Sequence, residues 1–147
     1  MASSITTAYG PFVWSLILAS TVVVLSIVPL GAARSKANFE MKDMEAPRAM
    51  FDRLPAWGKR ASWAHQNSFE SFSLHAPACL LCIFAIFIQK ESTPLAIGAA
   101  LLHPFLRLLY IGVYIGNIHW LRGLSWIGGL LCSAVLYSEG ARVILTS

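Results

Sequence analysis

Four long apolar stretches constrain this chain more than any other feature of its sequence. A helix needs about 20 predominantly apolar residues to cross the hydrocarbon core of a bilayer. The chain has 147 residues, of which 56% are hydrophobic and only 12% are charged, whereas soluble domains carry about 25% charged residues. The sequence therefore predicts an all-α membrane protein, a four-transmembrane-helix bundle that forms a single domain over residues 1–147.

The expected helices follow the apolar stretches and the breakers between them. They are predicted at residues 12–33, from about 57–60 to 89, at 94–117 and at 124–145. Because no Lys or Arg precedes the first stretch, we interpret it as a retained membrane anchor rather than a cleaved signal peptide. Pro77 is expected to kink the second helix.

Most of the charge lies in one polar segment, residues 34–60, which holds seven of the 11 Lys and Arg residues together with four acids. Positive residues stay on the cytoplasmic side of a membrane. We therefore predict a cytoplasmic long first loop and a cytoplasmic connection at Arg122, with both termini lumenal or periplasmic. The net charge of +4 does not predict a nucleic-acid partner, because the cations alternate with acids and no RNA-reading motif occurs.

Ionisable residues within membrane helices are costly and often mark function. On the second predicted helix, one face carries Arg60, Trp63, Asn67, Glu70 and Leu74, and on the third a face carries Arg107, Tyr110 and Tyr114. The second helix leaves the cytoplasmic side where the third arrives, so Glu70 and Arg107 are expected at similar depth, where they can form an ion pair.

Two interpretations of these faces remain open. In the first, Glu70 and Arg107 form a structural ion pair that fixes the register of two helices, and the tyrosines only pack. In the second, a polar pocket opens to the cytoplasm and is lined by Asn67, Glu70, Arg107, Tyr110, Tyr114 and Arg122. Such a pocket suits a small, charged, peptide-like ligand, and the neighbouring bilayer supplies a lipophilic second ligand.

Other chemical motifs carry less information. The three cysteines, Cys79, Cys82 and Cys132, lie in apolar segments, and we interpret them as packing residues rather than redox or metal ligands. The four histidines, at positions 65, 75, 103 and 119, lack the spacing of metal ligands, so no metal site is predicted. The sequence has no phosphate-binding loop or nucleophile elbow.

Two blocks of the sequence resemble the MAPEG family, the membrane-associated proteins in eicosanoid and glutathione metabolism. Residues 59–70, KRASWAHQNSFE, resemble the RA-x-x-AH-x-N-x-x-E stretch of its second helix. Residues 107–114, RLLYIGVY, followed by Arg122, resemble its third-helix block. The resemblance covers nearly the whole chain and is greatest to bacterial, particularly cyanobacterial, members.

The resemblance implies a four-helix protomer that assembles as a homotrimer, with glutathione bound between protomers near the cytoplasmic side. By match, the glutathione-binding positions are Asn67, Glu70, Arg107, Tyr110 and Tyr114, with Arg60 and His65 from the same second-helix block. Arg122 is the match to the arginine that stabilises the glutathione thiolate, although its spacing from Tyr114 differs by about one residue from the mammalian pattern. The implied activity is that of a membrane glutathione-dependent transferase or peroxidase acting on lipophilic electrophiles or hydroperoxides.

The sequence also departs from active members of the family. Trp63 and Gln66 occupy positions where active mammalian relatives have further arginines, and Tyr110 replaces a histidine of a prostaglandin-forming member. Fewer cations lower the expected affinity for a doubly acidic tripeptide. The alternative is therefore a non-catalytic protein of the same type, which binds a lipophilic ligand or scaffolds a larger membrane complex. Family membership alone does not distinguish these two functions.

Overall fold

The computed structural model of the chain describes the backbone of residues 2–146 and the side chains from residue 8 onward. The elements of this part of the chain are helices α1 (Ala2–Leu25), α2 (Ile27–Ser35), α3 (Ala56–Gln89), α4 (Pro94–Ile115) and α5 (His119–Thr146), with the short 3₁₀ helices η1 (Met41–Met44) and η2 (Pro47–Arg53) between α2 and α3. Four spans are long and apolar enough to cross a membrane, at Ala8–Ser35, Ala56–Gln89, Pro94–Ile115 and His119–Thr146. The predicted all-helical fold with four such spans is confirmed.

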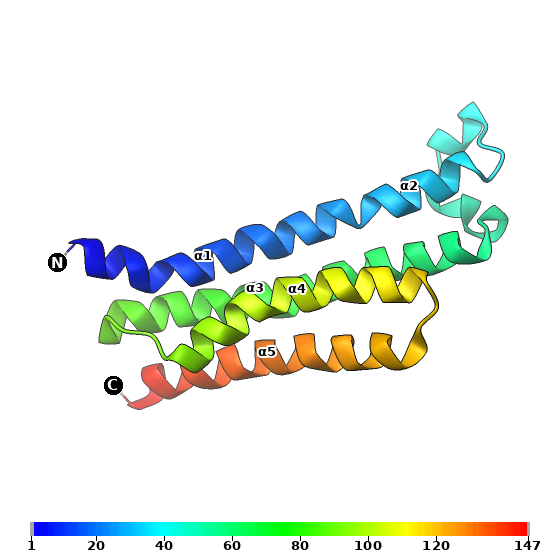
Figure 1. Cartoon of the computed structure of the whole chain (residues 1–147). Helices are drawn as coiled ribbons and strands as arrows, with labels where there is room; N and C mark the ends of the chain where they lie inside the picture. The colour runs from blue at the N-terminus through cyan, green and yellow to red at the C-terminus, as the bar shows by residue number, and fades with distance from the viewer. Residues whose placement is uncertain (1, 147) are drawn as a thin grey trace.

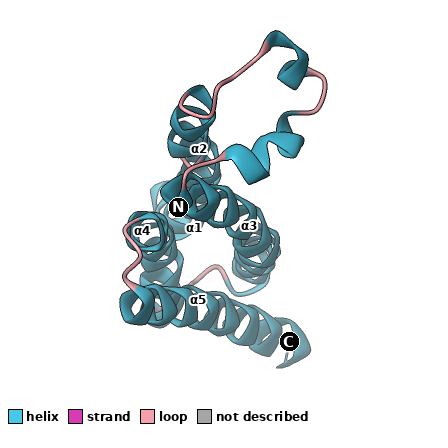
Figure 2. Cartoon of the chain, turned by 90° about the vertical axis from the view of Figure 1, so that its right-hand side faces the viewer, coloured by secondary structure: helices cyan, strands magenta, loops and turns pink. Residues whose placement is uncertain are grey.

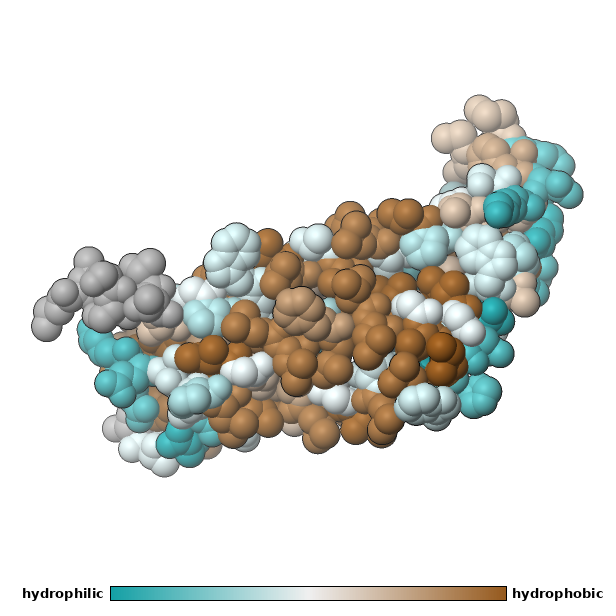
Figure 3. Space-filling model, viewed as in Figure 1, coloured by the Kyte–Doolittle hydropathy of each residue, from teal (hydrophilic) through white to brown (hydrophobic). Residues whose placement is uncertain are grey.

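The long helices run side by side and alternate in direction (Figure 1). Both termini and the α3–α4 turn lie at one end of the bundle, here called the terminal end. The 36–55 segment and the α4–α5 turn lie at the other, here called the loop end. In the view of Figure 3, a hydrophobic band covers the middle of the molecule, and hydrophilic residues gather at both ends. This is the surface expected of a bundle surrounded by lipid.

The first span is longer than the predicted 12–33 stretch, because α1 begins at Ala2 and α2 continues to Ser35. The break between them falls at Ser26, whose backbone N–H still donates to the carbonyl of Val22 at 3.0 Å. Pro29 lies in the first turn of α2. A proline in a first turn removes no intrahelical hydrogen bond, so it is tolerated there.

Helix α3 has 34 residues, which corresponds to a length of about 51 Å. A hydrocarbon core is only about 30 Å thick, so the polar first half of α3 extends beyond the core at the loop end. The polar residues of α3 therefore lie where the membrane meets water. Pro77 lies within this helix, which the structure assigns as one continuous element from Ala56 to Gln89.

Two tight turns connect the last three helices. Lys90 adopts a left-handed conformation with φ of 64° and ends α3, and the Thr93 hydroxyl then accepts a hydrogen bond from the Ala96 N–H as the N-cap of α4. At the other end, Asn117 adopts a left-handed conformation with φ of 62° in the turn between α4 and α5. Helix α5 begins at His119 rather than at the predicted Leu124, because polar residues at its start continue the helix past the apolar stretch. Arg122 therefore lies in the first turn of α5 and not in a loop.

The connection from α2 to α3 folds back beside these helices at the loop end (Figure 2). Met50 and Leu54 from this segment bury their side chains against Leu30 and Ala33 of α2. Asp43 is 8% exposed and accepts hydrogen bonds from the Glu40 N–H and from the guanidinium of Arg53. These two donors hold the pKa of Asp43 below its ordinary value of 3.8, so a network of its own stabilises the segment.

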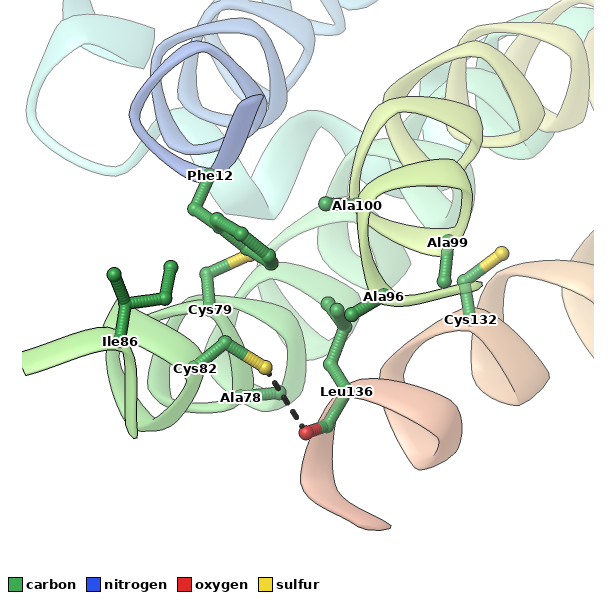
Figure 4. Packing of buried hydrophobic residues seen from close by; sticks show 10 residues of the cluster. All are labelled: Phe12, Ala78, Cys79, Cys82, Ile86, Ala96, Ala99, Ala100, Cys132 and Leu136. Atoms are coloured by element: carbon green, nitrogen blue, oxygen red, sulfur yellow. Dashed lines mark hydrogen bonds between the residues drawn. The ribbon is translucent and has the colours of Figure 1, made fainter. Parts of the chain in front are cut away.

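Small residues bring the helices into close contact at the terminal end. The buried cluster there contains three alanines of α4 at positions 96, 99 and 100, together with Cys79, Cys82 and Leu136 (Figure 4). The thiols of Cys79, Cys82 and Cys132 are free and buried. Cys82 Sγ donates to the carbonyl of Leu136 on α5 at 3.2 Å. The predicted packing role of the cysteines agrees with these contacts.

Candidate functional site

A polar cavity of about 370 Å³ lies between α3 and α4 in the half of the bundle nearer the loop end. It is lined by Trp63, Gln66, Asn67, Glu70, Tyr110 and Tyr114. Four of these residues, Asn67, Glu70, Tyr110 and Tyr114, belong to the predicted site. The other two are Trp63 and Gln66, the positions at which the sequence departs from active family members. The cavity therefore combines two amides, a carboxylate, two phenols and an indole.

Arg107 lies behind this cavity rather than in its lining, with only 3% of its surface exposed. Its Nη2 donates to the side-chain Oδ1 of Asn67 at 2.7 Å and to the Asn67 carbonyl at 3.2 Å. The expected direct ion pair with Glu70 is not formed among the described residues. Asn67 Nδ2 instead donates to Glu70 Oε2 at 2.8 Å. An amide can accept from a cation and donate to a carboxylate at once, so Asn67 links the two charges.

The second oxygen of Glu70 accepts a hydrogen bond from Gln66 Nε2 at 3.2 Å. Glu70 is exposed, whereas Arg107 is buried. The two residues therefore share a depth along the bundle, as predicted, but not a radial position. This difference explains why the pair is indirect: the carboxylate faces water, and the guanidinium faces the interior.

Two stacked tyrosine rings, with an arginine guanidinium at each end, run along one wall of the site. The Arg107 guanidinium lies 4.2 Å from the centre of the Tyr110 ring. Tyr110 and Tyr114 stack with their centres 5.4 Å apart, and the Arg122 guanidinium lies 4.7 Å from the centre of the Tyr114 ring. Cation–π contacts of this kind fix the position of a guanidinium. Arg122, which is half-buried, is thus next to the cavity, although it does not line it.

Two predicted site residues, Arg60 and His65, make their contacts away from the cavity. Arg60 Nε donates to the Ile115 carbonyl at 2.9 Å and so caps the C-terminal end of α4. His65 Nδ1 lies 2.6 Å from Ser26 Oγ, at the break between α1 and α2. In this chain both residues join neighbouring helices.

A cluster of polar residues lies one helical turn from Arg107, toward the terminal end. It was not predicted from the sequence. The imidazoles of His75 and His103 stack with ring centres 3.5 Å apart and planes within 3°. His75 contacts Ser15 Oγ at 2.8 Å and Ser133 Oγ at 3.3 Å, and His103 contacts Ser71 Oγ at 3.1 Å. The signal in the sequence was two histidines within otherwise apolar stretches. Searching only for metal-ligand spacing did not reveal their role.

These residues form no metal centre. Within the part of the chain that the structure describes, no group of three or more His, Cys, Asp or Glu side chains is placed to hold a metal ion. The cluster does contain two nitrogens that are buried and have no partner, His103 Nδ1 and Arg107 Nε. Both lie on the face of α4 that is close to Gly129 of α5.

The protein is a four-helix membrane protein whose polar cavity lies between the second and third spans, with Arg107 of the third span behind it and Arg122 of the fourth span beside it. The sequence matches the model of the MAPEG family over residues 11–141. The chain therefore belongs to the MAPEG family, and it is an integral, multi-pass membrane protein. No curated protein and no solved structure matches it.

Proposed function

We propose that this protein is a membrane glutathione-dependent transferase or peroxidase acting on lipophilic electrophiles or hydroperoxides. The observation that carries the proposal is the cavity at the loop end, which contains the hydrogen-bonded unit of Glu70 and Asn67. Beside it, the guanidinium of Arg122 packs on a lining tyrosine, Tyr114. Glutathione has an ammonium group, two carboxylates and a thiol. The cavity provides a matching carboxylate and hydrogen-bonding groups, and Arg122 beside it provides a cation.

Each residue has a distinct proposed role. Glu70 binds the ammonium group, since it is the exposed carboxylate of the cavity. Arg107 positions Asn67 through its two hydrogen bonds and does not contact the ligand. Arg122 stabilises the thiolate, because a nearby guanidinium lowers the pKa of a thiol from about 8.5. Bound glutathione would supply a sulfur nucleophile: the thiol proton passes to solvent, and the thiolate forms a thioether with the electrophilic carbon as the bond from that carbon to its leaving group breaks and the leaving group departs with the electron pair.

A specific observation favours the alternative, a non-catalytic protein that binds a lipophilic ligand or scaffolds a larger membrane complex. Trp63 and Gln66 line the cavity where active relatives are expected to have cations, and Trp63 is 47% exposed. An exposed indole beside a polar cavity suits an apolar ligand that enters from the bilayer. Under this alternative, Arg107 and Asn67 only hold α3 and α4 together.

Assembly and orientation are part of the same proposal. We infer a homotrimer in which a second copy of the chain closes the open side of the cavity, as the family resemblance implies. We also infer that the loop end faces the cytoplasm, because residues 34–60 hold seven of the 11 Lys and Arg residues. Cytoplasmic glutathione would then reach the cavity directly.

The proposal is tested by measuring glutathione binding to the purified protein by calorimetry and its ionisation by thiolate absorbance in the ultraviolet. For the wild-type protein we expect saturable binding at millimolar concentrations or below and a thiolate signal at neutral pH. Arg122→Ala should abolish most of the thiolate signal and weaken binding less. A charge-assisted hydrogen bond contributes about 1.5–3 kcal/mol, which predicts a thiolate pKa higher by about 1–2 units.

The matched control is Arg48→Ala, which removes the same charge from an exposed position of η2. It should leave both signals unchanged. If wild-type protein does not bind glutathione at millimolar concentration, the enzyme proposal is wrong. If it then binds a fluorescent lipophilic probe that Trp63→Ala weakens, the non-catalytic alternative is supported.

A further inference from the structure

A second cavity, of about 260 Å³, lies at the terminal end of the bundle, and none of the residues discussed above as the glutathione site lines it. Its walls come from all four spans, with Phe12 from α1, Ile86 from α3, Ala96 from α4 and Val143 from α5. It is therefore enclosed by a single chain. A site at this end is independent of the proposed glutathione chemistry at the loop end.

The inner wall of this cavity is apolar. Phe12 is fully buried, and Ile86 and Cys82 are 2% and 4% exposed. Figure 4 shows Phe12 lying over the two cysteines of α3, with Ala96 and Leu136 on the facing helices. Even the weak donor of Cys82 is used, because its Sγ bonds to the Leu136 carbonyl. This wall therefore offers contacts to hydrocarbon and no free polar group.

The rim of the cavity, in contrast, holds a carboxylate in a fixed position. The Thr93 hydroxyl donates to Glu139 Oε2 at 2.7 Å, and Arg142 Nη2 donates to the same oxygen at 3.2 Å. Thr93 is itself held in place, because its hydroxyl accepts from the Ala96 N–H at 3.1 Å. Both donors use Oε2, so Oε1 retains its capacity to accept a hydrogen bond from a ligand.

The charge of the lining favours a cation. Glu91 and Glu139 contribute two negative charges, and Arg142 contributes one positive charge; Lys90 is adjacent in sequence but does not line the cavity. The helix termini do not change this balance. Two N-terminal and two C-terminal ends meet at the terminal end, so their partial charges of about half a unit oppose one another.

The volume limits the size of the ligand. Pockets for drug-sized molecules measure about 300–1,000 Å³, so a cavity of about 260 Å³ accepts a short chain rather than a bulky ring system. An apolar interior and an anionic rim suit a ligand that has a hydrocarbon chain and a cationic group. We propose that this cavity binds an amphiphile that has a primary ammonium group on a single unbranched hydrocarbon chain. The chain lies against Phe12 and Ile86, and the ammonium donates to Glu139.

The test uses the full-length protein in phosphatidylcholine nanodiscs, with decylammonium as the probe and decanoate as a chain-matched anion. Empty nanodiscs measure partition into lipid alone. Decylammonium should bind saturably, one per chain, and decanoate should bind at least about tenfold more weakly, since a charge-assisted hydrogen bond is worth about that factor or more. A decylammonium analogue with a terminal diazirine should label Phe12, Ile86 or Val143 after irradiation.

Two variants locate the ammonium. Glu139→Gln should weaken decylammonium binding about tenfold. Glu139 also accepts hydrogen bonds from Thr93 and Arg142, so its substitution changes the rim as well as the charge. Glu91→Gln is therefore the second variant, and it should weaken decylammonium binding while leaving these hydrogen bonds intact. Glu45→Gln, which removes an exposed carboxylate at the loop end, is the matched control and should have no effect.

Equal affinities for decylammonium and decanoate would overturn the proposal, as would labelling confined to residues outside the cavity or unchanged binding in both Glu139→Gln and Glu91→Gln. Competition by phosphatidylethanolamine added to the nanodiscs would show that the cavity takes the head group of a two-chain lipid and would contradict the single-chain ligand, whereas absence of competition would support it. Glutathione binding at the loop end is measured separately. The two proposals can therefore fail independently.

Discussion

Asn67 links a buried cation to an exposed carboxylate, and this arrangement is the main finding at the scale of single residues. A guanidinium in the interior of a membrane bundle is costly unless its donors find acceptors. Arg107 obtains two acceptors from Asn67 alone, its side-chain oxygen and its backbone carbonyl. The same amide then orients Glu70, so one residue provides acceptors for the buried guanidinium and shapes the cavity.

Replacing Asn67 by Leu should therefore destabilise the protein by about 2–3 kcal/mol, the value for hydrogen bonds to a charged group. The backbone carbonyl remains as one acceptor, which keeps the loss below that of a fully unpaired buried charge. Asn67→Asp retains an oxygen acceptor and should cost less. The measurement is unfolding of the detergent-solubilised protein, followed by circular dichroism.

Gln66→Leu is the comparison for this change. It removes an exposed amide from the same helix turn, together with one hydrogen bond to Glu70, and a surface change of this kind stays within about 0.5 kcal/mol. Equal losses for Asn67→Leu and Gln66→Leu would show that the contact with Arg107 contributes nothing to stability.

At the scale of helices, the stacked imidazoles of His75 and His103 lie where all four spans meet. His75 contacts Ser15 of α1 and Ser133 of α5, and His103 contacts Ser71 of α3. Hydrogen bonds between helices within a membrane contribute about 0.6 kcal/mol each on average. Several of them at one level fix the register of the helices, which apolar packing alone specifies less strictly.

Gly140 sets the distance between α3 and α5. A Cβ atom there would lie 2.9 Å from Leu81 Cγ and 3.2 Å from the Cys82 backbone nitrogen. Gly140→Ala should thus force the helices apart and cost about 1–3 kcal/mol, the range for overpacked cores. The midpoint of thermal unfolding in detergent measures this loss.

Gly98 provides the matched control, because a Cβ atom there would meet nothing within 4 Å. Gly98→Ala in the exposed face of α4 should be neutral or stabilise the helix by up to about 1 kcal/mol. If both substitutions had the same effect, close packing at Gly140 would not be the cause.

The 36–55 segment has a pH dependence that follows from Asp43. Its pKa in the folded protein is lowered, first by the Glu40 N–H and then by the Arg53 guanidinium. A lowered folded pKa stabilises the segment above the unfolded pKa, near 3.8, and this stabilisation is lost as the pH falls through the folded value. We therefore expect a carbon-13 NMR titration of the Asp43 carboxyl to show a midpoint below 3.8.

At neutral pH, Asp43→Asn should mimic the acidic state and increase tryptic cleavage after Arg48 and Arg53. Asp52→Asn removes the same charge from η2 itself and should leave the cleavage rate near that of the wild type. An Asp43 midpoint at or above 3.8, or equal cleavage of the two variants, would contradict a structural role for the Asp43 network.

For the whole molecule, the apolar band between two polar ends (Figure 3) shows how the chain sits in a bilayer, and the open cavity suggests how copies associate. Apolar surface remains exposed at the cavity, where the lining residue Trp63 is 47% exposed. Lipid can cover such residues, but a second copy of the chain would also complete the wall of the site. This is the basis for the proposed homotrimer.

Native mass spectrometry of the protein released from nanodiscs should accordingly show three chains per particle. A cysteine introduced at position 63 or 66, both exposed residues of the cavity lining, should form crosslinks between chains if the cavity lies at the interface. A monomer in nanodiscs would contradict the trimer, and crosslinks absent from a confirmed trimer would place the interface elsewhere.

The four spans, their approximate limits and the faces that carry Asn67, Glu70, Arg107 and the two tyrosines could all be predicted from the sequence. Hydrophobic length and helical spacing are local properties, so they can be read along the chain. The start of α5 was predicted too far along the chain, because polar residues extend this helix beyond its apolar part.

The contacts between side chains of different helices, in contrast, depend on how the helices pack. The sequence placed Glu70 and Arg107 at one depth, but the packing of α3 on α4 put Asn67 between them. The same packing stacked His75 on His103, two residues that no spacing rule connects, and directed Arg60 and His65 away from the cavity. Depth follows from position along one helix, whereas partners depend on the rotation of each helix about its axis, which is set by contacts between distant parts of the chain.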